Sequence, residues 1–192
     1  MQICIFGASG DEIDPRYIEE TYALGQALAK NGHSMIFGGG AHGLMGAAAR
    51  GVYSERGKIV GVAPRFFDIP GVLFEHCDDF VWNDSMRDRK KYMEDNADAF
   101  IVVPGGIGTY EEFFEVLTLK QLARHAKPIV LFNVLGFFDP LIRLIADGTS
   151  SGFIRAQTES LFSVAATPEE ALRFAEEGEM DVNTIRFYDA QN

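Results

Sequence analysis

The segment best suited to chemistry is a glycine-rich turn followed by two carboxylates. It reads Pro104-Gly105-Gly106-Ile107-Gly108-Thr109-Tyr110-Glu111-Glu112 and follows an apolar run. Glycines let backbone N–H groups approach an anion closely, and the start of a helix adds the positive end of its dipole. The spacing matches neither the dinucleotide motif G-x-G-x-x-G nor the P-loop G-x-x-x-x-G-K-[ST]. The turn therefore favours a monophosphate ligand over NAD or ATP.

The same residues also fit a purely structural pattern. Thr109 to Glu112 match the capping box [ST]-x-x-[DE], in which Thr109 caps a helix and Glu112 folds back onto the cap N–H. Glycine-rich turns between a strand and a helix also occur simply because they make a tight connection. For this segment alone, function and capping remain alternatives.

A second candidate segment is the basic stretch at residues 85–93, where four cations fall within five consecutive positions. A helix through it puts four residues on one face: Met86, Arg89, Lys90 and Met93. Arg87 and Lys91 fit an ordinary solvated surface. Arg89 and Lys90 interrupt an apolar stripe, and a buried cation needs an anionic partner. A phosphate or a carboxylate would suit the planar fork of Arg89 and the point charge of Lys90.

These segments belong to a regular alternation of predicted strands and helices. Short apolar runs typical of buried strands occur at residues 3–6, 34–37, 58–63, 80–82, 99–103, 129–132 and 161–164. Segments of helical period occur at residues 15–31, 43–53, 85–96, 109–123, 137–147 and 168–177. The alternation predicts a three-layer α/β fold, with a mostly parallel sheet and helices on both faces.

Three glycine-rich loops follow predicted strands and should meet at the carboxyl edge of the sheet. They are Gly7-Ala8-Ser9-Gly10, Gly38-Gly39-Gly40 and Gly105-Gly106-Ile107-Gly108. Ligands of open α/β sheets bind at this edge. We therefore expect a shared cleft for a small nucleotide-like ligand, with candidate contacts from Ser9, Gly39, Gly40 and Gly105.

Composition bounds the class of protein. The 192 residues, 47% of them hydrophobic, suit one globular domain over residues 1–192. A net charge of −11 argues against nucleic-acid and anionic-membrane partners, and no apolar run is long enough to span a bilayer. We read no export signal, and two cysteines, Cys4 and Cys77, fit a reducing cytoplasm. The four scattered histidines imply no metal site, and we expect no cofactor.

The two segments together carry a family resemblance. The glycine turn matches the motif P-G-G-x-G-T-x-x-E of the Lonely Guy (LOG) family, and residues 86–93 resemble its M-H-E-R-K-x-x-M element. Residues 37–46 resemble the family segment G-G-G-x-x-G-L-M-G. The resemblance runs from Ile3 to about Phe153. Two positions differ: Arg87 replaces the usual histidine and Asp88 the usual acidic residue of the family.

The resemblance implies a Rossmann-like enzyme that cleaves the N-glycosidic bond of cytokinin riboside 5′-monophosphates. It implies catalytic roles for Arg89 and Glu112. It also implies substrate-binding positions at Lys90, Gly106, Gly108, Thr109, Glu111 and Thr118. Members of the family form homodimers, so a homodimer is expected by resemblance.

Several alternatives stay open at this stage. An apolar pocket for a prenylated adenine can draw on Met86, Phe66, Phe67 and Trp82, but each fits the core equally well, so AMP is an alternative substrate. A non-catalytic nucleotide carrier or sensor of the same fold is the rival class. The joint presence of Arg89 and Glu112 favours an enzyme. Lysine decarboxylation is rejected because no lysine has a recognisable setting for a pyridoxal Schiff base.

Overall fold

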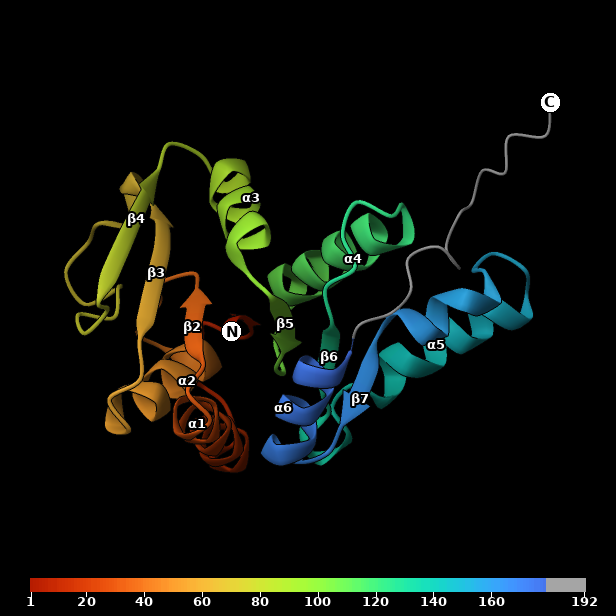
Figure 1. Ribbon diagram of the computed structural model, residues 1–192, viewed down its shortest axis with the longest axis horizontal. Helices are drawn as coiled ribbons and strands as arrows, with labels where there is room; N and C mark the ends of the chain where they lie inside the picture. The colour runs from red at the N-terminus through yellow and green to blue at the C-terminus, as the bar shows by residue number, and fades with distance from the viewer. Residues whose placement is uncertain (179–192) are drawn as a thin grey trace.

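In a computed structural model, residues 1–178 are described and form a seven-stranded sheet between helices (Figure 1). All neighbouring strands pair in parallel, in the order β4-β3-β2-β1-β5-β6-β7. The strands are β1 (Gln2–Phe6), β2 (Ser34–Phe37), β3 (Ile59–Pro64), β4 (Asp79–Asn83), β5 (Ala99–Val102), β6 (Ile129–Phe132) and β7 (Ser163–Ala165). The predicted α/β architecture is confirmed. The end of the expected domain, residues 179–192, lies outside the described residues.

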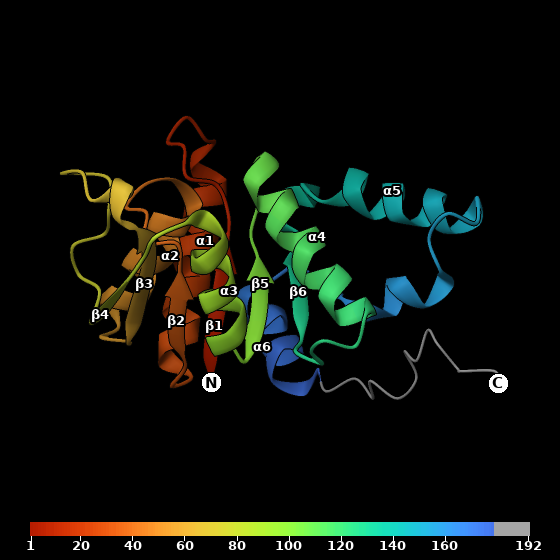
Figure 2. The ribbon, with the colours of Figure 1, turned by 90° about the horizontal axis from the view of Figure 1, so that it is seen from above.

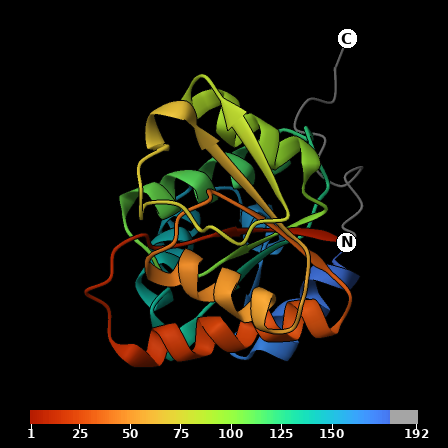
Figure 3. The same cartoon turned by 90° about the vertical axis from the view of Figure 1, so that its left-hand side faces the viewer.

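Helices cover both faces of the sheet, as the buried strands require (Figure 3). One face packs against α1 (Pro15–Lys30), α2 (Gly43–Ser54) and α6 (Pro168–Glu177). The other packs against α3 (Met86–Asn96), α4 (Ile107–Gln121) and α5 (Asp139–Ser150). Side chains of β1 alternate between the two cores, since Ile3 and Ile5 join the first whereas Cys4 and Phe6 join the second. Within the described part of the chain, none of the helices has the length and apolar character to cross a membrane.

Three short 3₁₀ helices were not predicted from the sequence pattern. They are η1 (Arg65–Phe67), η2 (Val134–Gly136) and η3 (Ala156–Leu161). Each is too short to show a hydrophobic period. Because η2 lies in the loop between β6 and α5, helix α5 begins at Asp139, two residues later than the expected start at position 137.

The capping-box interpretation of the glycine turn was wrong. Helix α4 begins at Ile107, its N-cap residue is Gly106, and no side chain caps it. Thr109 therefore already lies within the first turn, and Glu112 lies in the second turn. Glu112 is free to point away from the cap toward a neighbouring helix.

The order of the strands reverses between β1 and β5, which makes their carboxyl ends the switch point of the sheet. The two loops that follow them touch, because Ala8 N donates to Pro104 O at 3.0 Å. A Cβ on Gly105 would lie 2.1 Å from Thr109 Oγ1 and 2.8 Å from Ala8 N, so only glycine fits there. The fold thus places the first and third glycine loops together, where ligands of such sheets bind.

Candidate active site

Arg89 lies in the first turns of α3, under the carboxyl edge of the sheet. The helix starts at a Ser85 cap, whose hydroxyl accepts a hydrogen bond from Asp88 N at 3.1 Å. The Arg89 side chain is 7% exposed, its Nε donates to Val62 O at 3.1 Å, and its Nη1 lies 3.3 Å from Glu112 Oε1. A backbone carbonyl and a carboxylate thus hold a buried guanidinium in one orientation.

Gly38 makes room for this guanidinium. A Cβ at position 38 would lie 1.7 Å from Arg89 Nη2 and 2.9 Å from Cζ. Any larger residue would collide with the planar head of Arg89. The second glycine loop therefore packs against the Arg89 guanidinium. Gly38 makes this contact, whereas Gly39 and Gly40 do not.

Glu112 faces Arg89 from the second turn of α4, and its side chain is 11% exposed. Burial raises the pKa of Glu112 from its ordinary value of 4.5 to about 7, although the Arg89 charge and hydrogen bond act to lower it. Near neutral pH the carboxyl group therefore exists in both protonation states. A group of this kind can stabilise a developing cation, or exchange a proton, without leaving its place.

The first turn of α4 offers backbone donors beside this pair. No side chain caps the turn, and the first amides of a helix have no intrahelical acceptor. A Cβ on Gly106 or Gly108 would meet nothing within 4 Å, and Gly106 has an ordinary φ of −92°. The protein's own packing does not require glycine at these two positions. Open space at a helix N-terminus suits an anion that must approach the backbone closely.

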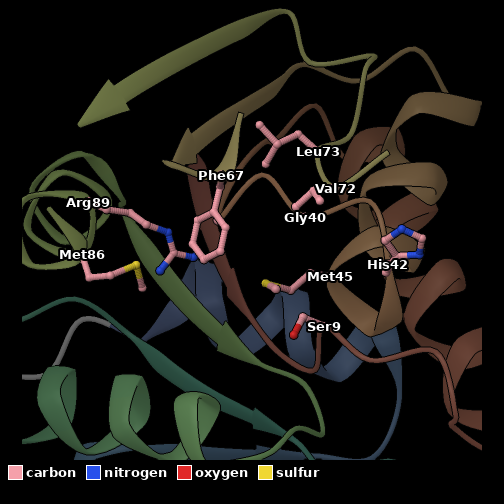
Figure 4. A pocket seen from close by; sticks show the side chains of 10 residues that line it. Ser9, Gly40, His42, Met45, Phe67, Val72, Leu73, Met86 and Arg89 are labelled. Atoms are coloured by element: carbon pink, nitrogen blue, oxygen red, sulfur yellow. The ribbon is translucent and has the colours of Figure 1, made fainter. Parts of the chain in front are cut away.

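A pocket of about 350 Å³ opens beside Arg89 (Figure 4). Its walls are mainly apolar and come from the first two glycine loops, α2, α3 and the segment 65–74: Ser9, Gly38, Gly40, His42, Met45, Phe67, Val72, Leu73, Met86 and Arg89. The third glycine loop does not line it. Figure 4 shows Phe67 and Met86 pointing into the same space as the guanidinium. Of the proposed base-binding side chains, Phe67 and Met86 line the pocket, whereas Trp82 packs on Phe80.

The segment that covers this pocket is attached to the second glycine loop. Phe74 N donates to Gly39 O at 2.8 Å, and Ala41 N donates to Val72 O at 3.0 Å. Gly39 adopts a φ of +77° beside the Phe80 ring, which supplies a reason for glycine there. This cover could not be predicted from the sequence pattern, because residues 65–78 contain little regular secondary structure.

The structure brings most of the predicted site residues together. Four line the pocket: Ser9, Gly40, Met86 and Arg89. Five lie on the turn and the start of α4: Gly105, Gly106, Gly108, Thr109 and Glu112. The other four have different settings. Gly39 does not line the pocket and lies beside the Phe80 ring. Lys90 and Glu111 form an ion pair with each other, and Thr118 is exposed on α4, roughly 13 Å along the helix from Thr109.

Four pocket residues had not been predicted to contribute to the site: His42, Met45, Val72 and Leu73. Met45 and Leu73 look like core residues in the sequence. His42 stands between Gly40 and Gly43, and its nearness to the second glycine loop was a usable signal.

Several known proteins resemble this chain in sequence. A family model described as "Possible lysine decarboxylase" matches residues 45–174. The cytokinin riboside 5′-monophosphate phosphoribohydrolase LOG of Oryza sativa subsp. japonica is 35% identical over 92% of this chain and 73% of its own length. The Arabidopsis thaliana enzyme LOG7, of the same name, is 34% identical over 96% of this chain and 85% of its own.

Solved structures with the same fold include a molybdenum cofactor carrier protein from Chlamydomonas reinhardtii. It superposes with a TM-score of 0.70 at 22% identity, over 92% of this chain and 96% of the other. At this identity the likeness shows the fold alone. The sequence matches go further, since they cover most of both chains and include the glycine turn and the basic helix. The chain therefore belongs to the LOG family, whose model carries the lysine decarboxylase description.

Proposed function

We propose that this protein hydrolyses the N-glycosidic bond of cytokinin riboside 5′-monophosphates, AMP or both, releasing an adenine-type base and ribose 5-phosphate. The observation that carries the proposal is the buried pair of Arg89 and Glu112, 3.3 Å apart between a helix N-terminus and an apolar pocket. The names of the relatives support the same reaction.

The phosphate would bind at the first turn of α4, against the amides near Gly106, Gly108 and Thr109. Binding there uses the non-reacting end of the substrate to orient its anomeric carbon. The base would lie toward the pocket beside Arg89, where Phe67 and Met86 offer apolar contact. The glycosidic bond would then pass close to the carboxyl group of Glu112.

The bond breaks through a ribosyl cation with oxocarbenium character, so a carboxylate beside the anomeric carbon lowers the barrier. In this proposal ionised Glu112 stabilises that cation and orients the attacking water. Arg89 keeps Glu112 in place and holds ribose or phosphate oxygens. Water supplies the hydroxyl group to the sugar and a proton to balance the departing base.

Two substrate classes remain to be separated by experiment. The apolar wall of the pocket suits the purine itself and also a prenyl group on its exocyclic nitrogen. The relatives' names favour the prenylated nucleotides. Comparing AMP with isopentenyladenosine 5′-monophosphate measures the preference directly.

A carrier or sensor of a nucleotide-like ligand is the second candidate. The observation in its favour is the fold shared with the molybdenum cofactor carrier protein. A binder needs the glycine loops and a cation, whereas a buried carboxylate near bound phosphate weakens binding unless the chemistry uses it. The buried setting of Glu112 therefore favours the enzyme.

We also propose, from the family resemblance, a homodimer that works in a reducing cytoplasm. Cys4 and Cys77 are both free thiols, which fits that compartment. Light scattering of the purified chain would measure the mass in solution.

The test of the reaction is product analysis with purified wild type, Arg89→Ala and Glu112→Gln. Each protein is incubated with AMP and with isopentenyladenosine 5′-monophosphate, and the products are separated by chromatography. Release of base and ribose 5-phosphate by wild type but not by either variant supports the proposal. Tight binding of both nucleotides without release would favour the carrier instead.

A further inference from the structure

Lys90 has a setting unlike that of a substrate-binding cation. Its ammonium group forms ion pairs with Glu111 and with Glu115, the latter at 2.6 Å between Nζ and Oε2. The Lys90 side chain is 16% exposed, and the residue is not among those lining the pocket beside Arg89. Burial opposes the charge, but the two carboxylates outweigh it and raise the pKa of Lys90. Lys90 is therefore charged and already neutralised by α4.

These ion pairs cross a gap between two helices. Helices α3 and α4 lie on the same face of the sheet, on either side of β5 (Figures 1 and 2). Their backbones make few close contacts, unlike those of α1 and α2 on the opposite face. At the deeper end, Met93 of α3 joins the apolar core that includes Val116 of α4. Nearer the site, ion pairs join the two helices, from Arg89 and Lys90 on α3 to Glu111, Glu112 and Glu115 on α4.

The distance across this gap decides whether Arg89 meets Glu112. Arg89 is anchored to β3 through Val62 O, so it does not follow α4 if that helix moves. The Arg89–Glu112 contact of 3.3 Å is already long for a hydrogen bond. A shift of α4 by a few tenths of an ångström would break it.

We propose that Lys90 is a positioning residue, which fastens α3 to α4 through Glu111 and Glu115 and so sets the contact between Arg89 and Glu112. It acts on the reaction through that pair and does not bind the phosphate. The effect on the reaction rests on the proposed hydrolase function and is tested by kinetics. The effect on the distance between Arg89 and Glu112 does not depend on that function and is tested by crystallography.

The kinetic test compares Lys90→Gln, Glu115→Gln and the matched control Lys91→Gln. Lys91 is the next lysine of the same helix, but it is exposed and pairs with Asp95 within α3. Hydrolysis of the nucleoside monophosphate is followed from pH 5 to 9. The temperature stays well below each variant's melting temperature, so that differences in kcat do not arise from unfolding. Inhibition by inorganic phosphate is measured beside it.

The positioning role predicts a lower kcat in both Lys90→Gln and Glu115→Gln, by tenfold or more, since a misplacement of about 1 Å can cost about a hundredfold. KM and phosphate inhibition should stay unchanged, and Lys91→Gln should match wild type. Phosphate binding by Lys90 predicts the opposite pattern. Lys90→Gln would raise KM and weaken phosphate inhibition, whereas Glu115→Gln, which frees the lysine, would lose nothing. That pattern would overturn the proposal.

A crystal structure of Glu115→Gln and of Lys90→Gln provides the geometric test, which needs no activity. We expect the Arg89 Nη1 to Glu112 Oε1 distance to exceed hydrogen-bond range in both. An unchanged distance in both variants would refute the positioning role whatever the kinetics. If wild type releases no base from any nucleotide, the proposed reaction fails, while this structural outcome still decides the role of Lys90.

Discussion

Replacing Glu112 by glutamine should abolish base release and at the same time make the protein more stable. Burial raises the pKa of Glu112 from 4.5 to about 7, so the folded protein holds a proton on this group that the unfolded chain has lost between those pH values. Stability therefore falls as the pH rises from about 4.5 to about 7, because the native state binds more protons than the unfolded state. Glutamine resembles the protonated group and avoids this loss.

The size of the effect follows from the two pKa values. Glu112→Gln should gain about 1 kcal/mol over wild type at pH 5 and about 3 kcal/mol at pH 8. For a chain of this length, 3 kcal/mol corresponds to a rise in Tm of about 6 to 12 °C. The pKa of about 7 already includes the attraction of Glu112 to Arg89. In the variant, the amide oxygen of the glutamine can still accept a hydrogen bond from Arg89.

Urea unfolding of wild type and Glu112→Gln at the two pH values measures this difference. Glu111→Gln is the control, because Glu111 is the adjacent carboxylate and is largely exposed. The variant of Glu111 should show no gain that grows with pH. Two results would refute the raised pKa of Glu112 and the cost of ionising it in the fold. One is a Glu112→Gln variant no more stable than wild type at pH 8, and the other is a gain in stability that is the same at both pH values.

Four other substitutions test the site. Gly38→Ala should reduce activity at least tenfold and destabilise the fold, because its Cβ would lie 1.7 Å from Arg89 Nη2; an active, stable variant would contradict this. Gly106→Ala should keep stability within about 0.5 kcal/mol, since its Cβ meets nothing, but weaken phosphate binding by calorimetry. Arg89→Ala should raise the pKa of Glu112 further above its ordinary value, as ¹³C NMR of the carboxyl group would show. Phe67→Ala should raise the KM for isopentenyladenosine 5′-monophosphate; an unchanged KM would place the base elsewhere.

The layout of the fold was predictable because it depends on simple periodicities. Strands buried on both faces appear as short apolar runs, and the helices between them carry a clear apolar stripe. Parallel strands put their carboxyl ends at one edge, so the meeting of the glycine loops near Gly7 and Gly105 followed from the alternation. The strong signals in the site, Arg89 and the glycine turn, were visible as residues that break a local pattern.

Features set by contacts between distant segments were not predictable. The collision that reserves position 38 for glycine involves Arg89, which lies 51 residues later in the chain. The cover over the pocket depends on hydrogen bonds between Gly39 and Phe74, in a segment of irregular backbone. The partners of Lys90 depend on the spacing of two helices. The sequence showed that this charge needed an anion, but not that α4 supplies it.

The most direct test of the role of the Arg89–Glu112 pair is a single-turnover experiment, in which isopentenyladenosine 5′-monophosphate is mixed with an excess of wild type or of Glu112→Gln. The products are quenched in acid and separated. We expect wild type to convert the bound nucleotide into equal amounts of free base and ribose 5-phosphate, whereas Glu112→Gln should bind the nucleotide and leave it intact. Recovery of intact nucleotide from wild type, or equally fast release by Glu112→Gln, would contradict the assigned role of the Arg89–Glu112 pair.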